Sequence, residues 1–265
     1  MSGRRSNIII KNAEEIRKIE IACRIVAETL VLLEKYVVPG VSTLELDSIA
    51  EDYIKSKNAH PAFKGYPVDD KFFPGSLCIS VDDEVVHGLP SERKLKEGEI
   101  VSLDCGAYIN GFYGDSAVTY PVGKVSDDKT RLMRVTEESL YLGIDQARQN
   151  KKIYDIARAI QNHCERNGFS LTRELVGHGI GKNLHEDPAV PNFVPPLLYK
   201  NRFPNEKLLL GMAIAIEPMV HFGRKEVKTA TDGWTVVTSD KSPAAHFEHT
   251  IVITQDKPLI LTSRN

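Results

Sequence analysis

The chain has 265 residues, of which 42% are hydrophobic and 26% charged, and its formal net charge is −2. This composition is typical of a globular protein with a sizeable core. It gives no argument for membrane binding or nucleic-acid specificity. Neither a signal-peptide core nor an apolar run long enough for a membrane span occurs. The four cysteines are widely separated, which indicates reduced buried thiols rather than a zinc module: Cys23, Cys78, Cys105 and Cys164. We therefore expect a cytoplasmic protein.

Two N-terminal segments, residues 12–36 and 42–54, carry apolar residues at helical spacing. Asn12 followed by Glu15 is typical of a helix start, and Ser42 with Glu45 forms a capping-box pattern. The next predicted strand, residues 77–81, follows a loop-like stretch over 61–75. Later segments are predicted in the same way: helices over 128–148 and 153–167, a proline-rich loop over 191–204, and strands over 208–216, 235–238 and 250–254.

A hairpin with paired carboxylates is predicted around Asn110-Gly111, since both positions of a type I′ turn need a positive φ. Residues 100–103 form a strand that is expected to end at Asp104. With the turn at 110–111, Asp104 faces Ala117 and Asp115 faces Gly106. The two aspartates then lie on one face of the hairpin, about 7–8 Å apart. Cys105 has the opposite strand parity, which argues against its joining the same site.

The two halves of the sequence contain similar motifs in the same order. Residues 95–104 align without gaps with 208–217, so that Asp104 corresponds to Glu217. Asp115 corresponds to Glu248 in the same way, and His87-Gly88 to His178-Gly179. Two similar halves about a pseudo-twofold axis, roughly 12–125 and 128–262, would bring four carboxylates and a histidine together. We therefore expect one catalytic domain over residues 1–265.

Four clustered carboxylates repel each other unless cations neutralise them. Two divalent ions would balance the four negative charges, and such pairs polarise a carbonyl and activate a water. Oxygen ligands with one imidazole suit Mn, Fe, Co or Zn, and the ligand types leave the choice among these metals open.

At this point the sequence resembles the type I methionine aminopeptidase family over roughly residues 7–262. The resemblance rests on nine motifs: 86–88 (VHG), 103–104 (LD), 111–115 (GFYGD), 177–181 (GHGIG), 185–188 (HEDP), 190–192 (VPN), 216–219 (IEPM), 231–234 (TDGW) and 247–250 (FEHT). It implies the pita-bread fold, an α/β (α+β) architecture of two pseudo-twofold halves with antiparallel sheet inside and helices outside. It also implies hydrolytic removal of an N-terminal methionine when the second residue is small.

The resemblance assigns five metal ligands. Asp115 and Glu248 would bridge two divalent ions. His178 and Glu217 would complete the coordination of one ion, and Asp104 that of the other. Glu217 or Glu248 would accept a proton from the attacking water. A monovalent cation is also implied, near Asp82, which stands where the family commonly has Asn.

The resemblance also assigns catalytic and substrate-binding residues. His185 would stabilise the tetrahedral intermediate, and His87 would contact the substrate near the scissile amide. Four more residues would surround the methionine side chain: Phe63, Tyr66, Cys78 and Trp234. By contrast, His60, His163, His221 and His249 are expected to be structural or surface residues. The partners implied are nascent polypeptide N-termini and the ribosome near its exit tunnel, for a monomeric enzyme.

Two alternatives stay open at this stage. One is a proline-specific aminopeptidase or creatinase-like hydrolase of the same fold, which usually carries an additional N-terminal domain. The other is a catalytically inactive member that acts as a binding module. Such proteins lose metal ligands, whereas all five are present here.

Overall fold

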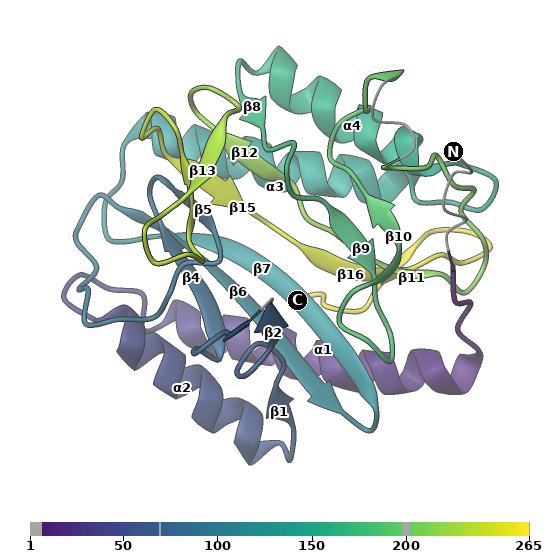
Figure 1. Cartoon of the computed structure of the whole chain (residues 1–265), viewed down its shortest axis with the longest axis horizontal. Helices are drawn as coiled ribbons and strands as arrows, with labels where there is room; N and C mark the ends of the chain where they lie inside the picture. Colours follow the sequence, from purple (N-terminus) through teal and green to yellow (C-terminus); the bar gives the residue numbers. More distant parts are fainter. Residues whose placement is uncertain (1–6, 69, 198–201, 265) are drawn as a thin grey trace.

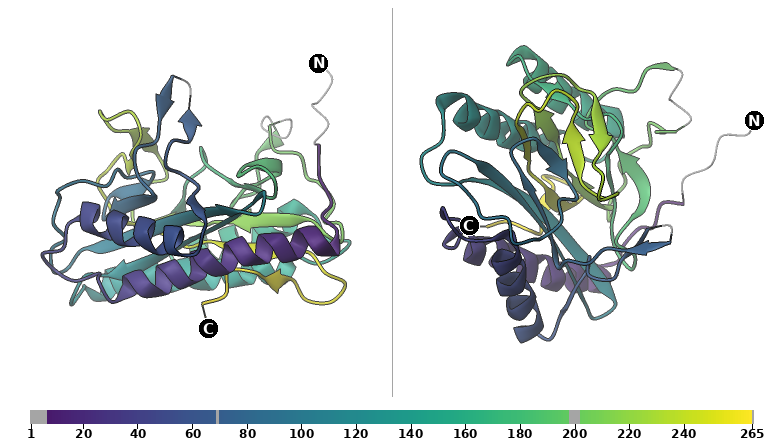
Figure 2. Two further views of the ribbon diagram at one scale, coloured as in Figure 1. Left: turned by 90° about the horizontal axis from the view of Figure 1, so that it is seen from below. Right: turned by 60° about the vertical axis from the view of Figure 1, so that its left-hand side comes forward.

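The chain folds into antiparallel strands with the long helices on one side of them. The computed structural model describes residues 7–68, 70–197 and 202–264. Residues 198–201 of the expected 191–204 loop lie outside this description, as do Asp69 and the first six residues. In the part of the chain that is described, no helix has the length and apolar character needed to cross a membrane. Figure 2 shows the helices below the strands in its left view, with the β2–β3 hairpin (β2, Pro67–Val68; β3, Lys71–Phe72) projecting on the opposite side.

The predicted helices are confirmed with small shifts at their ends: α1 (Ala13–Glu34), α2 (Thr43–Ser56), α3 (Asp127–Gln146) and α4 (Ile153–Arg166). The Asn12 side chain accepts hydrogen bonds from the N–H groups of Glu14 and Glu15, and the Glu15 carboxylate accepts from the Asn12 N–H. Ser42 and Glu45 form the same reciprocal cap at α2. These caps satisfy backbone groups that a helix end leaves unpaired.

The carboxylate hairpin has the predicted register. It consists of β6 (Ile100–Ile109) and β7 (Phe112–Pro121), with Asp104 opposite Ala117 and Asp115 opposite Gly106. Asn110 and Gly111 have φ angles of 54° and 83°, as the turn requires. The expectation that the first strand ends at Asp104 is wrong, because every residue from 100 to 109 finds a partner on β7.

The strands form antiparallel sheets whose neighbours are often distant in sequence (Figure 1). In the first sheet β6 pairs with β7, β1 (His60–Pro61) and β4 (Leu77–Val81). A five-stranded sheet has the order β10 (Glu186–Val190), β9 (Gly177–Gly179), β11 (Ala213–Ile216), β16 (His249–Val252) and β17 (Leu259–Ile260). One three-stranded sheet has the order β15 (Ala244–His246), β12 (Met219–His221) and β8 (Ser170–Leu171). Another has the order β13 (Val227–Thr229), β14 (Val236–Thr238) and β5 (Glu84–Val86).

The predicted strand over 208–216 is correct only in its second part. The chain turns at Leu209–Met212, where the Met212 N–H donates to the Leu209 carbonyl and Gly211 has a φ of 81°. The strand β11 therefore starts at Ala213. An apolar run does not by itself reveal such a turn, because Leu209 and Leu210 are apolar although their side chains are exposed.

Strands β7 and β16 lie side by side and join the two halves of the chain. The Glu248 N–H donates to the Ala117 carbonyl at 2.9 Å, and the Thr250 hydroxyl donates to the Asp115 carbonyl at 2.7 Å. The Ser116 hydroxyl donates to the Glu248 carbonyl at 2.5 Å. The main chain around two of the predicted metal ligands is thereby held in one place.

Helix α1 packs directly on the carboxylate hairpin. A Cβ atom at Gly114 would lie 2.5 Å from the Cys23 main-chain nitrogen, so only glycine permits this approach. All four cysteines are free and buried, as predicted. Cys105 belongs to the hydrophobic core on the side away from Asp104 and Asp115, which agrees with its opposite parity.

Candidate metal centre

A cavity of about 410 Å³ opens between the sheets, and every predicted site residue lines it. Its wall combines one group of carboxylates and histidines with a group of apolar residues. The predicted metal ligands present are Asp104, Asp115, His178, Glu217 and Glu248. The predicted catalytic and substrate-binding residues present are Phe63, Tyr66, Cys78, His87, His185 and Trp234. The structure therefore brings together residues that span most of the chain.

Different elements supply the polar residues. Asp104 and Asp115 come from β6 and β7, and His178 from β9. Glu217 directly follows β11, and Glu248 directly precedes β16. The ligand atoms of Asp115, His178 and Glu248 lie within 4.8 Å of one another.

The tautomer of His178 points to a cation in this cluster. Its Nδ1 lies 2.9 Å from the Gly179 carbonyl, which can only accept, so Nδ1 carries the proton. In the neutral ring Nε2 then offers a lone pair. That atom faces Asp115 Oδ2 at 3.8 Å and Glu217 Oε1 at 3.7 Å, and both of these are acceptors. A metal ion between them would satisfy all three atoms, and a histidine ligand normally holds its other nitrogen in this way.

Unpaired carboxylate oxygens also indicate a cation-binding site. Asp104 Oδ1, Asp115 Oδ1 and Glu248 Oε1 are buried without a hydrogen-bond partner among the described residues. Buried polar atoms are nearly always paired, so such a cluster is suited to binding a cation. Hard oxygen donors with one imidazole suit a divalent ion. The residues present thus fit divalent metal binding.

Burial and mutual repulsion raise the pKa of three of the four carboxyl groups in the metal-free protein. The pKa of Asp104 rises to about 7, mainly because the group is desolvated. The pKa values of Asp115 and Glu248 are raised well above their usual range by desolvation and by neighbouring carboxylates. At Glu217 desolvation acts in the same direction, but the imidazoles of His246 and His178 outweigh it and lower the pKa.

We expect these raised pKa values to make metal affinity depend on pH. A divalent ion must displace the protons, so affinity should fall by up to about tenfold per displaced proton for each pH unit below about 7. Calorimetric titration of the metal-free protein with Mn²⁺ at pH 6, 7 and 8, in buffers of different ionisation enthalpy, measures both affinity and proton release. At pH 6, Asp104→Asn should release about one proton fewer than the unaltered protein, because the pKa of Asp104 is about 7. Binding that is independent of pH and releases no protons would contradict the expectation.

His185 is held by Tyr66. The Tyr66 hydroxyl lies 2.8 Å from His185 Nδ1, and the His178 and His185 rings meet edge to face with centroids 4.4 Å apart. When Tyr66 donates to Nδ1, the ring proton is on Nε2. The pocket walls desolvate the ring and the neighbouring His178 imidazole acts in the same direction, so the pKa of His185 is lowered to about 4. His185 is therefore neutral at physiological pH and can donate a hydrogen bond from Nε2.

A buried ion pair supports the loop that carries His185. Lys11 Nζ lies 2.5 Å from Glu186 Oε2, and both side chains are 3% exposed. The ammonium also donates to the Ile9 carbonyl, and Glu186 Oε1 accepts from the Asn183 N–H. These bonds join the N-terminal segment to the loop between β9 and β10.

Breaking this pair should destabilise the protein strongly. Lys11→Met leaves Glu186 buried without its partner, which should lower the free energy of unfolding by about 3–5 kcal/mol. Lys18→Met removes an exposed pair with Glu14, at 2.9 Å, and should leave the free energy of unfolding nearly unchanged. Urea unfolding compares the two variants. If both substitutions lowered the free energy of unfolding by the same amount, the Lys11–Glu186 pair would not be desolvated as its burial indicates.

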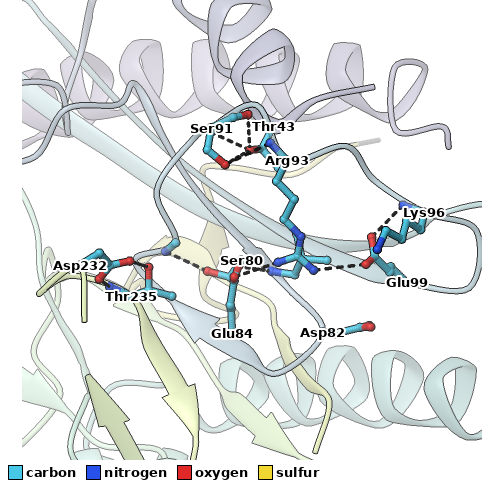
Figure 3. A network of polar contacts seen from close by, with 12 residues as sticks. Thr43, Ser80, Asp82, Glu84, Ser91, Arg93, Lys96, Glu99, Asp232 and Thr235 are labelled. Carbon is cyan, nitrogen blue, oxygen red and sulfur yellow. Dashed lines mark hydrogen bonds and ion pairs between the residues drawn. The ribbon is translucent and has the colours of Figure 1, made fainter. Parts of the chain in front are cut away.

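The segment that follows His87 is fixed by a separate polar network. Figure 3 shows Arg93 between Glu84 and Glu99, with distances of 2.9 and 3.2 Å. Glu84 also accepts from the Val81 N–H, and the Ser80 hydroxyl accepts from the Gly88 N–H. A Cβ at Gly88 would lie 2.1 Å from the Ile79 carbonyl, so glycine is required beside His87. His87 itself is exposed at the cavity wall, with a φ of 59°.

The apolar part of the cavity is lined by aromatic residues and a thiol. Phe63, Cys78 and Phe73 belong to one buried cluster, against which Tyr66 and Trp234 pack. The Phe73 and Trp234 rings meet edge to face at 5.3 Å. This wall could hold a flexible apolar side chain next to the carboxylates. The four histidines expected elsewhere lie outside the cavity lining; His221, for example, bonds the Thr172 hydroxyl and the Arg224 carbonyl.

Other residues of the cavity wall were not predicted as site residues, among them Phe73 and His246. Phe73 supports Trp234, and His246 lines the cavity 3.6 Å from Glu217. A signal for His246 was present in the sequence, because it stands only two positions before the predicted ligand Glu248. Only the fold places it next to Glu217.

Comparison with known proteins shows the family. Residues 17–255 match the family described as "Metallopeptidase family M24". "Methionine aminopeptidase 1" of Bacillus subtilis (strain 168) is 51% identical over 255 residues, which cover 96% of this chain and 99% of that protein. "Methionine aminopeptidase" of Escherichia coli (strain K12) is 45% identical over 259 residues, with coverage of 97% and 94%.

Solved structures agree with these relatives. A crystal structure of methionine aminopeptidase from Rickettsia prowazekii has a TM-score of 0.90 and 36% identity, and the match covers 97% of this chain and 100% of that chain. Prolidase from Pyrococcus furiosus has a TM-score of 0.76 and 22% identity, and the match covers 66% of that chain. The prolidase likeness shows the fold alone. The expected pita-bread architecture is confirmed, and the chain belongs to metallopeptidase family M24 and, within it, to the methionine aminopeptidases.

Proposed function

We propose that the protein removes the N-terminal methionine from polypeptides whose second residue is small, by hydrolysis at a pair of divalent metal ions. The observation that carries the proposal is the His178 lone pair facing Asp115 and Glu217 beside an apolar wall. In this proposal Asp115 and Glu248 would be ligands shared by both ions, His178 and Glu217 would be further ligands of one ion, and Asp104 of the other. Co, Mn, Fe and Zn all fit these donors.

When bound, such a metal pair polarises a carbonyl and makes a water nucleophilic near neutral pH. The protein's own groups then bind and orient the substrate. The methionine side chain occupies the wall of Phe63, Cys78 and Trp234, where sulfur–aromatic contacts add about 0.3–1.5 kcal/mol. His87 contacts the substrate near the scissile amide.

Two residues act on the reacting groups. His185, with its proton on Nε2, donates a hydrogen bond to the carbonyl oxygen and stabilises the negative charge that develops there. Glu217 or Glu248 accepts a proton from the attacking water. The lowered pKa of Glu217 supports its presence as a carboxylate for that step.

A peptide series tests the proposal. We expect kcat/KM to be highest for Met-Ala-Ser, lower for Leu-Ala-Ser and lowest for Met-Lys-Ser, at constant metal concentration. A bulky second residue would move the scissile carbonyl away from the metal pair. One methylene in an apolar pocket changes the rate by only about 10- to 200-fold, so Leu-Ala-Ser should retain some activity. A preference for Ala-Pro-Ser would indicate a proline-specific enzyme, and no cleavage with any metal would indicate a binding module.

We further propose one catalytic domain over residues 1–265, composed of related halves at 12–125 and 128–262. Two helices precede each carboxylate strand pair, α1 and α2 in the first half and α3 and α4 in the second, which supports a repeat. A monovalent cation near Asp82 would bind main-chain oxygens, because the Asp82 side chain is paired with Lys129 Nζ at 2.6 Å.

The proposed partners are nascent polypeptide N-termini, and the ribosome near its exit tunnel. We also propose that the protein acts as a monomer. The four free thiols support a cytoplasmic location.

A further inference from the structure

His246 is a buried imidazole whose ring has no hydrogen bond. The residue is 2% exposed, and neither Nδ1 nor Nε2 has a partner among the described residues. The other buried histidine of the same small sheet, His221, has both nitrogens satisfied. Since buried polar groups are nearly always paired, the unpaired ring at the cavity wall indicates a role in the site.

The main chain fixes where this ring points. The His246 N–H donates to the Thr119 hydroxyl oxygen at 2.9 Å, and the same hydroxyl lies 2.8 Å from the His246 carbonyl. On its other side His246 is paired with Met219 across β15 and β12. The strand is thus held from two directions, and its side chain lines the cavity.

The ring faces one particular oxygen of Glu217. His246 Nε2 lies 3.6 Å from Oε2, whereas His178 Nε2 lies 3.7 Å from Oε1. His178 belongs to the cluster with Asp115 and Glu248, so Oε1 is on the metal side and Oε2 on the outer side. The Glu217 carbonyl is held by the Asn192 amide at 2.9 Å. This bond holds the main chain of Glu217, but its side-chain carboxylate can still rotate.

We propose that His246 is a positioning residue whose Nε2–H donates to Glu217 Oε2 and turns Oε1 toward the metal. The 3.6 Å separation is slightly longer than a hydrogen bond, and a small rotation of the carboxylate closes it. A donor on the outer oxygen of a ligating carboxylate orients that ligand, and its loss typically weakens metal binding about 10- to 100-fold. The inference rests on the proposed role of Glu217 as a metal ligand.

The test uses the metal-free full chain and Co²⁺ as the probe. Calorimetric titration gives the affinity of each site, the visible absorption of bound Co²⁺ reports its coordination, and thermal unfolding without metal reports the fold. His246→Leu removes the donor, and His246→Gln keeps an N–H at similar reach. His221→Leu is the matched control, because it removes a buried imidazole of the same sheet outside the cavity.

We expect His246→Leu to weaken binding of one Co²⁺ by about 10- to 100-fold and to change its absorption. Its metal-free Tm should fall less than that of His221→Leu, because the loss is one 3.6 Å contact with Glu217 rather than two hydrogen bonds. His246→Gln should stay within about threefold of the original affinity, since it retains the donor. His221→Leu should lower the metal-free Tm and leave Co²⁺ affinity unchanged.

Two results would overturn the inference while leaving the proposed metal centre in place. One is binding of both ions by His246→Leu with the original affinities. The other is binding by His246→Gln as weak as by His246→Leu, which would make the imidazole itself a ligand. If the unaltered protein bound no divalent ion, the metal centre and this inference would fall together.

Discussion

Replacing Asp115 by asparagine should abolish peptide hydrolysis and leave the fold intact. Asp115 sits between Asp104 and Glu248 in the proposed metal pair, and its Oδ1 is unpaired in the structure. Because a metal ion supplies several kcal/mol of transition-state stabilisation, we expect kcat/KM for Met-Ala-Ser to fall by at least about 10³-fold. The metal-free protein should be no less stable, since one buried and mutually repelling acid has been removed.

Asp47→Asn is the matched control for this substitution. Asp47 is also buried, but its Oδ1 accepts the N–H groups of Ser76 and Leu77 outside the cavity. An amide oxygen retains both bonds, so activity should persist. The measurements are kcat/KM and the rise in Tm on adding Mn²⁺, which Asp115→Asn should lose. Near-normal turnover in an Asp115→Asn preparation free of unaltered enzyme would show that the bridging assignment is wrong.

Replacing His185 by alanine should lower kcat about 10²- to 10³-fold, the usual cost of one lost oxyanion donor. Metal content should stay normal, because His185 is proposed to contact the substrate rather than the ions. KM should change little, since the interaction develops mainly in the transition state. Tyr66→Phe should have a smaller effect, about tenfold on kcat, because the His185 ring remains but its tautomer is no longer fixed.

His163→Ala provides the comparison for a histidine outside the site. His163 pairs with Glu138 at 2.9 Å between α4 and α3, and its loss should leave kcat unchanged. Metal analysis of each purified variant separates the roles. If His185→Ala lost a metal ion, His185 would be a ligand, and if it kept the original kcat, it would have no part in the reaction.

The sequence predicted features that depend on neighbouring residues. The helix caps at Asn12 and Ser42 and the turn at Asn110-Gly111 are local, because each is decided by groups within a few positions. Once that turn was assigned, strand alternation placed Asp104 and Asp115 on one face, and the structure has this register. The metal-ligand set came from the internal repeat and from the resemblance to a family whose membership the comparisons show.

Long-range pairing decided the remaining features. Strand β6 also pairs with β1 and β4, which precede the hairpin in the sequence, and β11 pairs with β9 and β16. Strands of three residues, such as β9, β12 and β15, have no periodicity long enough to detect and exist through their partners.

The chain by itself thus determined which chemical groups are available, where its helices begin and which hairpin presents the first two carboxylates. Only the tertiary structure decided how groups far apart in sequence meet. Tyr66 reaches His185 across 119 positions, and Lys11 reaches Glu186 across 175. His246 stands beside Glu217 because β12 and β15 pair. The physical reason is that caps and turns depend on contacts within one segment, whereas these contacts require burial and pairing of the whole fold.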